Sequence, residues 1–161
     1  MRQKNAEARE KFLHTLEWLL AVTKRYSGSL QFGLAMISHV DPKLLGETYG
    51  AKKAVQQLDE GLYSLRKAFR TTDLVARDGL DFWILIPFPS ADEKISDKIK
   101  YILESASLAG LQIVERDISI FLLPMNDASV SENITPLQFL AHLKANQATL
   151  AHREVTLPAS A

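Results

Sequence analysis

The chain has 161 residues, equal numbers of basic and acidic side chains (19 Lys and Arg against 19 Asp and Glu) and no cysteine. A chain of this length is predicted to form one main domain with a substantial core. Its balanced charge argues against a nucleic-acid partner, and the lack of cysteine excludes disulfides and thiolate metal sites. No apolar run reaches the roughly 20 residues that span a bilayer. We therefore expect a cytoplasmic protein that does not insert into membranes.

The first part of the chain is predicted to contain two long helices and one buried strand. An amphipathic helix is expected over residues 6–25, within an N-terminal helical segment of residues 1–28. Residues 30–37 form a short apolar run, which is typical of a strand buried on both faces. Residues 39–49 indicate an irregular or short helical connection. A second helix over residues 51–69 has a predicted inward face of Val55, Leu58, Leu62, Leu65 and Phe69.

A hairpin is predicted over residues 74–86. Its strands cover residues 74–76 and 82–86, and Asp78 and Gly79 mark the turn because glycine tolerates a positive φ. Asp81 stands at the start of the second strand. The sequence thus places a carboxylate on a rigid element at the mouth of a loop.

The second part of the chain is predicted to add two helices and the rest of the sheet. The Ser90–Glu93 spacing indicates a capping box that begins a helix, and residues 111–114 and 118–123 are predicted to be strand, interrupted at residues 115–117. Thr135, Pro136 and Gln138 indicate the start of a last helix that runs to about residue 150. The main domain is expected over residues 29–155, followed by a disordered tail at 156–161. Trp18 and Trp83 are interpreted as packing residues.

The order of these elements predicts an α+β fold. A β-α-β-β-α-β succession is typical of a ferredoxin-like antiparallel sheet with flanking helices. This fold class also underlies polymerase palms and nucleotide cyclases, so it leaves the function open.

Residues 70–87 resemble the central hairpin of the GGDEF family, the diguanylate cyclase domain of bacterial signalling. In that family a run of the form R-x-x-D-L-V-A-R-x-G-G-D-E-F precedes an apolar strand that ends in proline. Here the signature loop is Gly79-Leu80-Asp81-Phe82-Trp83, which matches the family at its first and third positions. The resemblance extends over residues 12–124.

The resemblance implies a cyclase site that has lost several of its functional groups. Joining two GTP molecules is phosphoryl transfer, which depends on Mg²⁺ held by carboxylates. By resemblance, Ser38 stands where one metal carboxylate belongs and Asp81 retains the other. The remaining matched positions are Lys43, which faces phosphate; Gly46 and Val55, which replace the residues that read guanine; and Gly79, Leu80 and Phe82 of the loop. We therefore expect no catalysis and no bound metal; Mg²⁺ would serve only if activity were retained.

A second nucleotide site is implied by Arg70 and Asp73, which match the family's R-x-x-D motif. In relatives that use this motif, it binds the product, cyclic di-GMP. Lys98 and Lys100 on the following predicted helix could supply further cations. The alternative is structural, because a cation at the end of a helix is favoured in any case and Asp73 could pair with Arg70 or Arg77.

These features predict a catalytically inactive GGDEF-like regulatory domain of cyclic di-GMP signalling. It would bind cyclic di-GMP at Arg70 and Asp73, or dock a partner protein through the loop around Leu80, Phe82 and Trp83. Two alternatives stay open. One is a divergent active diguanylate cyclase or other nucleotidyl enzyme that uses Asp81. The other is a structural dimerisation domain of a larger sensor, with the first helix transmitting the signal.

Overall fold

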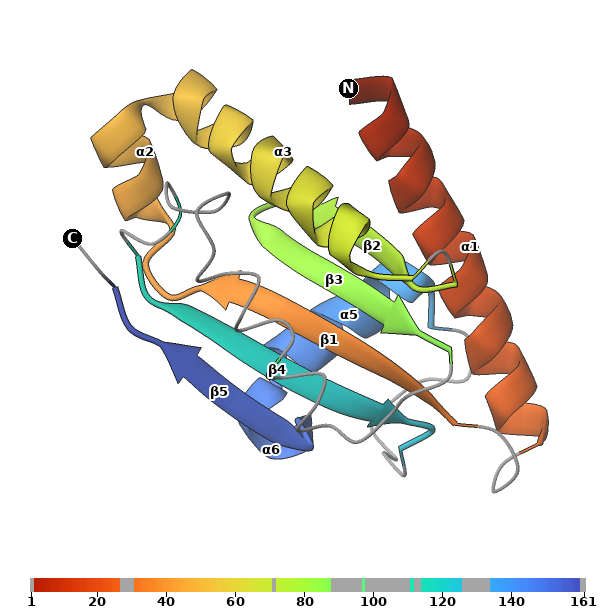
Figure 1. Ribbon diagram of the computed structural model, residues 1–161. Coiled ribbons are helices and arrows are strands. Elements are labelled where there is room, and N and C mark those ends of the chain that lie inside the picture. Colours follow the sequence, from red (N-terminus) through yellow and green to blue (C-terminus); the bar gives the residue numbers. More distant parts are fainter. Residues whose placement is uncertain are drawn as a thin grey trace.

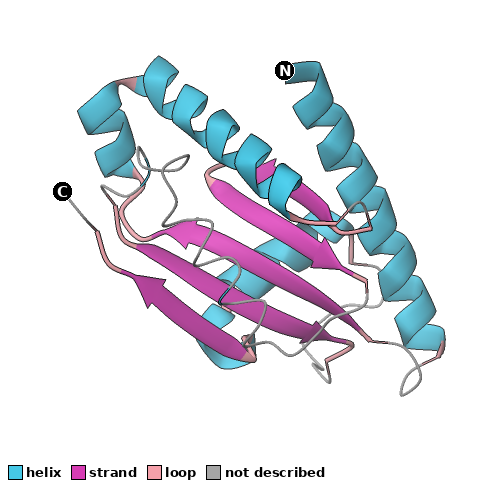
Figure 2. Cartoon of the chain, in the orientation of Figure 1, coloured by secondary structure: helices cyan, strands magenta, loops and turns pink. Residues whose placement is uncertain are grey.

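The computed structural model describes residues 2–26, 31–70, 72–87, 97, 111, 114–125 and 134–159. In this part of the chain, a five-stranded antiparallel sheet with strand order β2-β3-β1-β4-β5 carries helices on both faces (Figure 1, Figure 2). This arrangement confirms the predicted α+β class. The elements are α1 (Arg2–Arg25), β1 (Phe32–His39), α2 (Lys43–Tyr49), α3 (Ala51–Ala68), β2 (Leu74–Asp78), β3 (Asp81–Ile86), β4 (Arg116–Leu123), α5 (Pro136–Ala145), α6 (Gln147–Leu150) and β5 (Arg153–Leu157).

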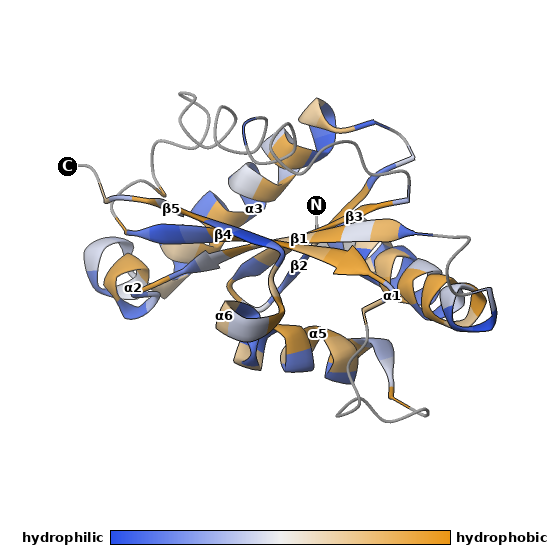
Figure 3. Cartoon of the chain, turned by 90° about the horizontal axis from the view of Figure 1, so that it is seen from below, coloured by the Kyte–Doolittle hydropathy of each residue, from blue (hydrophilic) through white to orange (hydrophobic). Residues whose placement is uncertain are grey.

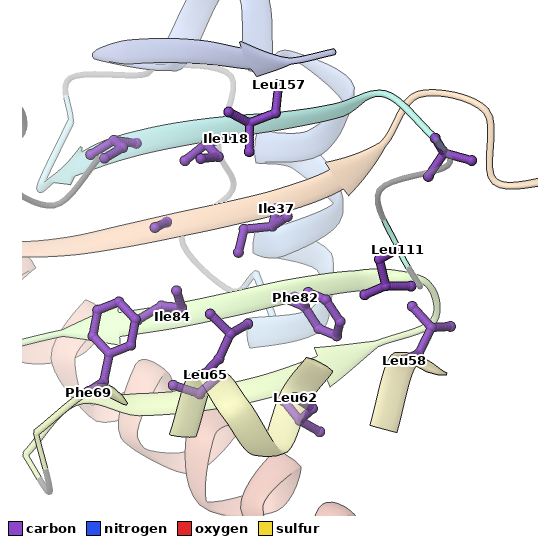
Figure 4. Close-up of a cluster of buried hydrophobic side chains, with 14 of the residues drawn as sticks. Ile37, Leu58, Leu62, Leu65, Phe69, Phe82, Ile84, Leu111, Ile118 and Leu157 are labelled. Carbon is purple, nitrogen blue, oxygen red and sulfur yellow. The ribbon is translucent and has the colours of Figure 1, made fainter. Parts of the chain in front are cut away.

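The core has two halves, one on each face of the sheet. Figure 3 shows the helices that cover these faces, α3 on one and α5 with α6 on the other. Successive residues of a strand point to opposite faces, so Ile37 and Phe82 pack beneath α3 while Met36 and Trp83 pack against α1 and α5. Figure 4 shows the first half, in which Leu58, Leu62 and Leu65 of α3 lie over the sheet residues. Every residue of β1 is buried, as the apolar run predicted.

The hairpin between β2 and β3 closes through a two-residue loop, Gly79 and Leu80, because Asp78 pairs directly with Asp81. Gly79 has a φ of 61° and Leu80 has no positive φ. A positive φ at the first loop residue alone is the requirement of a type II′ turn, which suits glycine there. The turn is therefore centred one residue later than the sequence indicated.

The start of α5 confirms the predicted capping box. The Thr135 hydroxyl accepts from the Gln138 backbone N–H at 3.2 Å, and the Gln138 side chain accepts from the Thr135 N–H at 3.0 Å. Phe139, Leu140 and Leu143 are buried against the sheet. The helix is thus fixed at its N-terminus and along its apolar face, which positions the residues of its last turn.

Val55 does not lie on the inward face of α3, contrary to the prediction. Its side chain is 42% exposed, whereas Ala54 is 7% exposed and faces the core. The buried positions run through Ala54, Leu58, Leu62 and Leu65. Val55 lies about 100° further round the helix than Ala54, since each residue turns by that angle.

Trp18 also departs from its interpretation as a packing residue. It is 63% exposed on α1, while Trp83 is 2% exposed and buried as expected.

The last strands differ from the prediction at two places. Leu111 lies in a short helical turn and Val114 in a bend, so neither belongs to a strand; both side chains are buried in the α3-side core. β4 instead begins at Arg116, inside the predicted interruption.

The predicted disordered tail begins too early. Thr156 and Leu157 are part of β5, an edge strand paired with β4. Leu157 is buried, and the Thr156 hydroxyl donates to Asp117 Oδ1 at 2.8 Å. The helix predicted from Ser90 lies outside the described residues apart from residue 97, which is helical.

Within the ranges described above, no helix is long and apolar enough to cross a membrane.

Candidate functional site

The two positions matched to metal carboxylates lie side by side at one end of the sheet. β1 and β3 pair with Ile37 opposite Phe82, so continuing this register places Ser38 opposite Asp81. Ser38 and Asp81 are 8% and 7% exposed. Strand alternation puts both on the face covered by α5. The two residues are therefore neighbours across β1 and β3.

Lys144 reaches into this site from the last turn of α5. Its Nζ lies 2.5 Å from Asp81 Oδ2, and the Asp81 side chain is 10% exposed while that of Lys144 is 53% exposed. A charge-assisted contact of this kind is among the stronger hydrogen bonds in proteins. The negative charge of Asp81 is thus neutralised by a side chain of the same chain.

His39 lies at the same end of the sheet but, by strand alternation, on the α3-side face with Ile37 and Phe82 rather than on the face of Ser38 and Asp81. Its Nδ1 lies 2.9 Å from the Leu80 carbonyl oxygen, and its ring meets that of Phe82 edge-on at a centroid distance of 6.0 Å. Because a carbonyl only accepts, Nδ1 carries the proton and Nε2 holds a lone pair. Nε2 is buried and has no hydrogen-bond partner among the described residues.

The environment of His39 favours its neutral form. Burial lowers the pKa of His39 below its ordinary value of 6.5, more than the Leu80 carbonyl and the Asp81 charge raise it; Arg116 and Lys144 lower it further. Arg116 lies directly opposite His39 in the β1–β4 register. The neutral imidazole therefore links β1 to the hairpin loop through its hydrogen bond to the Leu80 carbonyl.

The loop exposes less apolar surface than its sequence suggested. Leu80 is 39% exposed, but Phe82 is fully buried on the α3 side and Trp83 is buried on the α5 side. The predicted docking of a partner through Phe82 and Trp83 is therefore wrong for these two side chains. They are core residues because β3 is covered on both faces.

The other matched positions of the predicted cyclase cleft are exposed. Lys43 begins α2, Gly46 lies within it, and Val55 is on the outer side of α3. Gly79 is exposed at the hairpin turn. None of these residues has a hydrogen bond to Ser38 or Asp81 within the described ranges. The site around Ser38 and Asp81 is formed by residues of β1, β3 and α5.

Arg70 and Asp73 form the turn between α3 and β2. The Asp73 N–H donates to the Arg70 carbonyl at 2.9 Å, and Asp73 Oδ2 accepts from the Arg70 N–H at 3.4 Å. These contacts fit the structural alternative for Asp73. Arg70 is exposed, so its guanidinium faces solvent. Lys98 and Lys100 lie outside the described residues.

A network of polar contacts links α1 and α3 to the β2–β3 hairpin. Arg9 pairs with Asp78 at 3.1 Å, and Arg77 pairs with Asp59 of α3 at 3.2 Å. Arg77 also donates to the Gly79 carbonyl at 2.9 Å. Asn5 completes the network: it donates to Asp59 at 3.2 Å and accepts from Arg66 at 2.9 Å. The turn that carries Leu80 is thus held from both α1 and α3.

The donor set at the sheet end fits Mg²⁺ poorly. Mg²⁺ prefers carboxylate oxygens in octahedral geometry, whereas here a serine stands beside a single carboxylate that already has an ammonium partner. In the described part of the chain, no three His, Cys, Asp or Glu side chains are grouped so that they could hold a metal ion.

Comparisons with known proteins define the fold at a finer level. No model of a protein family matches the chain, and no curated protein matches it. Among solved structures, the GGDEF domain of YfiN (also called TpbB) from Pseudomonas aeruginosa is similar with a TM-score of 0.61 and 21% sequence identity, over 87% of this chain and 86% of that one.

Two further structures show the same similarity. The diguanylate cyclase SiaD from Pseudomonas aeruginosa, solved with its activator SiaC, has a TM-score of 0.61 and 15% identity over 87% of this chain, which spans 53% of that protein. The GGDEF domain of DgcB from Caulobacter crescentus, solved with c-di-GMP, has a TM-score of 0.59 and 14% identity over 87% of this chain and 82% of that one.

These likenesses define the fold as an α+β domain built on an antiparallel sheet. More specifically, the chain has the fold of GGDEF domains.

Proposed function

We propose that this chain is a catalytically inactive GGDEF-like regulatory domain of bacterial cyclic di-GMP signalling. The observation that carries the proposal is the contact of Lys144 with Asp81, the one matched metal carboxylate that remains. An ammonium group at this carboxylate supplies the positive charge that a divalent cation would supply in a cyclase. A cation that bound Asp81 would have to displace the Lys144 ammonium group.

The neighbouring positions support the same conclusion. Ser38 offers a neutral hydroxyl beside Asp81, and a hydroxyl is a weaker Mg²⁺ ligand than a carboxylate. Leu80 brings a side chain to a loop position where the family resemblance expects glycine, whose missing Cβ lets the backbone approach a nucleotide. Val55, at a position matched to guanine reading, has an apolar side chain that can accept no hydrogen bond from a base.

Incubation of the chain with GTP and Mg²⁺ or Mn²⁺, followed by chromatography, tests the lack of activity directly. We expect no cyclic di-GMP and no other nucleotide product. The second candidate, a divergent cyclase, rests on the retained Asp81. Product that disappears in Asp81→Ala but persists in Glu60→Ala, an exposed acidic control on α3, would establish that candidate and overturn the proposal.

The regulatory part of the proposal is that cyclic di-GMP binds at Arg70 and Asp73. An exposed guanidinium next to a carboxylate offers planar donors for phosphate or a guanine edge and an acceptor for its N–H groups. The solved complex of DgcB with c-di-GMP is a precedent for ligand binding by a domain of this fold.

Isothermal titration with cyclic di-GMP tests this site separately from catalysis. Heat of binding should be lost in Arg70→Ala and retained in Arg25→Ala, which removes an exposed arginine at the end of α1. Binding that survives Arg70→Ala would place the ligand elsewhere. No heat at high-micromolar ligand would remove the receptor function and leave partner binding as the regulatory route.

A further inference from the structure

A groove lies between α1 and the start of α5, on the face of the sheet opposite to α3. It is lined by the apolar residues Leu13, Pro136 and Leu137 and by four polar residues, Glu10, His14, Glu17 and Thr135; its volume is about 310 Å³. Leu137 is 40% exposed, whereas Phe139, Leu140 and Leu143 of the same helix are buried. The lining thus combines apolar side chains with two carboxylates.

Trp18 extends this apolar surface along α1. It follows His14 by four residues, so the two share one face of the helix, and 63% of the indole side chain is exposed. Tryptophan is enriched among the residues that contribute most to binding at protein–protein interfaces. The groove residues and the Trp18 indole, one helical turn beyond His14, together make up a strip along α1.

The negative charge of Glu10 and Glu17 on this strip favours a partner that is positively charged. Glu10 and Glu17 are seven residues apart, which is about 10.5 Å along a helix. Neither is in an ion pair among the described residues, and Lys11, the neighbouring cation, does not line the groove. Residues 126–133, which precede α5, include Asp127 and Glu132 but no lysine or arginine. That segment therefore carries no positive charge that could complement Glu10 and Glu17.

We propose that this strip is a docking surface for a basic amphipathic helix of a partner protein. A groove between two helices suits a third helix that inserts large apolar side chains, here between Leu13 and Leu137. Two partner cations seven residues apart, on the same face as those apolar side chains, match the spacing of Glu10 and Glu17. The surface lies on α1 and α5 and does not depend on the nucleotide chemistry proposed above.

A charge-swap experiment tests the proposal with synthetic probes. Two fluorescently labelled helical peptides of equal length carry a central pair of leucines; one has flanking lysines seven residues apart and the other has glutamates in their place. By fluorescence anisotropy, the lysine peptide should bind roughly tenfold more tightly, the combined effect of two surface ion pairs. The preference should weaken as salt is added.

Variants of the chain locate the binding. The double variant Glu10→Lys with Glu17→Lys should reverse the preference and select the glutamate peptide. The control double variant Glu47→Lys with Glu60→Lys adds the same charge at exposed positions of α2 and α3 and should keep the native preference. All four positions are exposed, and circular dichroism checks that each variant is folded.

Three outcomes would overturn the proposal. The first is equal binding of the two peptides by the native chain. The second is an equal response of the groove variant and the control variant, which would indicate a general charge effect. The third is a homodimer in sedimentation that dissociates in Leu137→Glu, since a second copy would then be the occupant.

Discussion

Asp78 and Asp81 stand opposite each other across the same hairpin and pair with different helices. Asp78, whose side chain is 44% exposed, forms an ion pair with Arg9 of α1, whose side chain is 39% exposed. Asp81 meets Lys144 of α5 with its own side chain only 10% exposed. The Asp78–Arg9 ion pair is therefore largely solvated, whereas Lys144 is the partner of a buried carboxylate. Burial of the carboxylate decides how much each pair contributes.

The largest effect is expected at Lys144. The Lys144→Met variant keeps much of the side-chain volume but leaves Asp81 buried without its partner, which should cost about 2 kcal/mol of unfolding free energy. Urea denaturation measures this loss. Asp81→Asn should cost less, because the half-exposed Lys144 can turn to water, and the double variant should recover part of the loss. A Lys144→Met variant as stable as the native chain would show that water, rather than Lys144, solvates Asp81.

An intermediate effect is expected from His39 as the pH falls. Because its folded pKa lies below the unfolded value of 6.5, the unfolded chain takes up the proton first. The contribution of His39 is thus fully present above about pH 6.5 and declines at lower pH, by at most about 1.4 kcal/mol per pH unit. Urea midpoints at pH 7.5 and pH 5.5 test this.

The control for this pH dependence is His39→Gln, which removes the titrating group. It should flatten the decline, whereas His14→Gln, at an exposed position on α1, should leave it unchanged. If both variants lost stability in the same way as the native chain, other groups would account for the acid sensitivity.

The smallest effect is expected at Arg9. Arg9→Ala removes a solvated ion pair with Asp78 and should lower stability by less than about 1 kcal/mol, and by less still at high salt. Denaturation at two salt concentrations measures it. A loss as large as that of Lys144→Met would mean that the two pairs are equivalent and that burial is not what distinguishes them.

Local chemistry made much of the fold predictable. The Thr135–Gln138 capping box and the glycine of the hairpin loop depend on residues close in sequence, and the structure has both features. The apolar run of β1 was recognisable because helices cover both faces of the central strand. These signals fix where elements begin and end.

The contents of the site were less predictable, because its contacts join distant parts of the chain. Asp81 and Lys144 are 63 residues apart, and His39 and Leu80 are 41 apart. No periodicity or motif indicates such pairs. The same limit explains β5, whose edge position depends on pairing with β4, and Val55, whose exposure depends on how α3 is rotated over the sheet.

We propose that Lys144, rather than a divalent cation, neutralises the charge of Asp81. This proposal can be tested by titrating the chain with Mn²⁺ in the presence of GTP and following free Mn²⁺ by electron paramagnetic resonance. We expect the same free Mn²⁺ signal for the native chain and for Asp81→Ala at every concentration. Stoichiometric Mn²⁺ binding by the native chain that is lost in Asp81→Ala would contradict it.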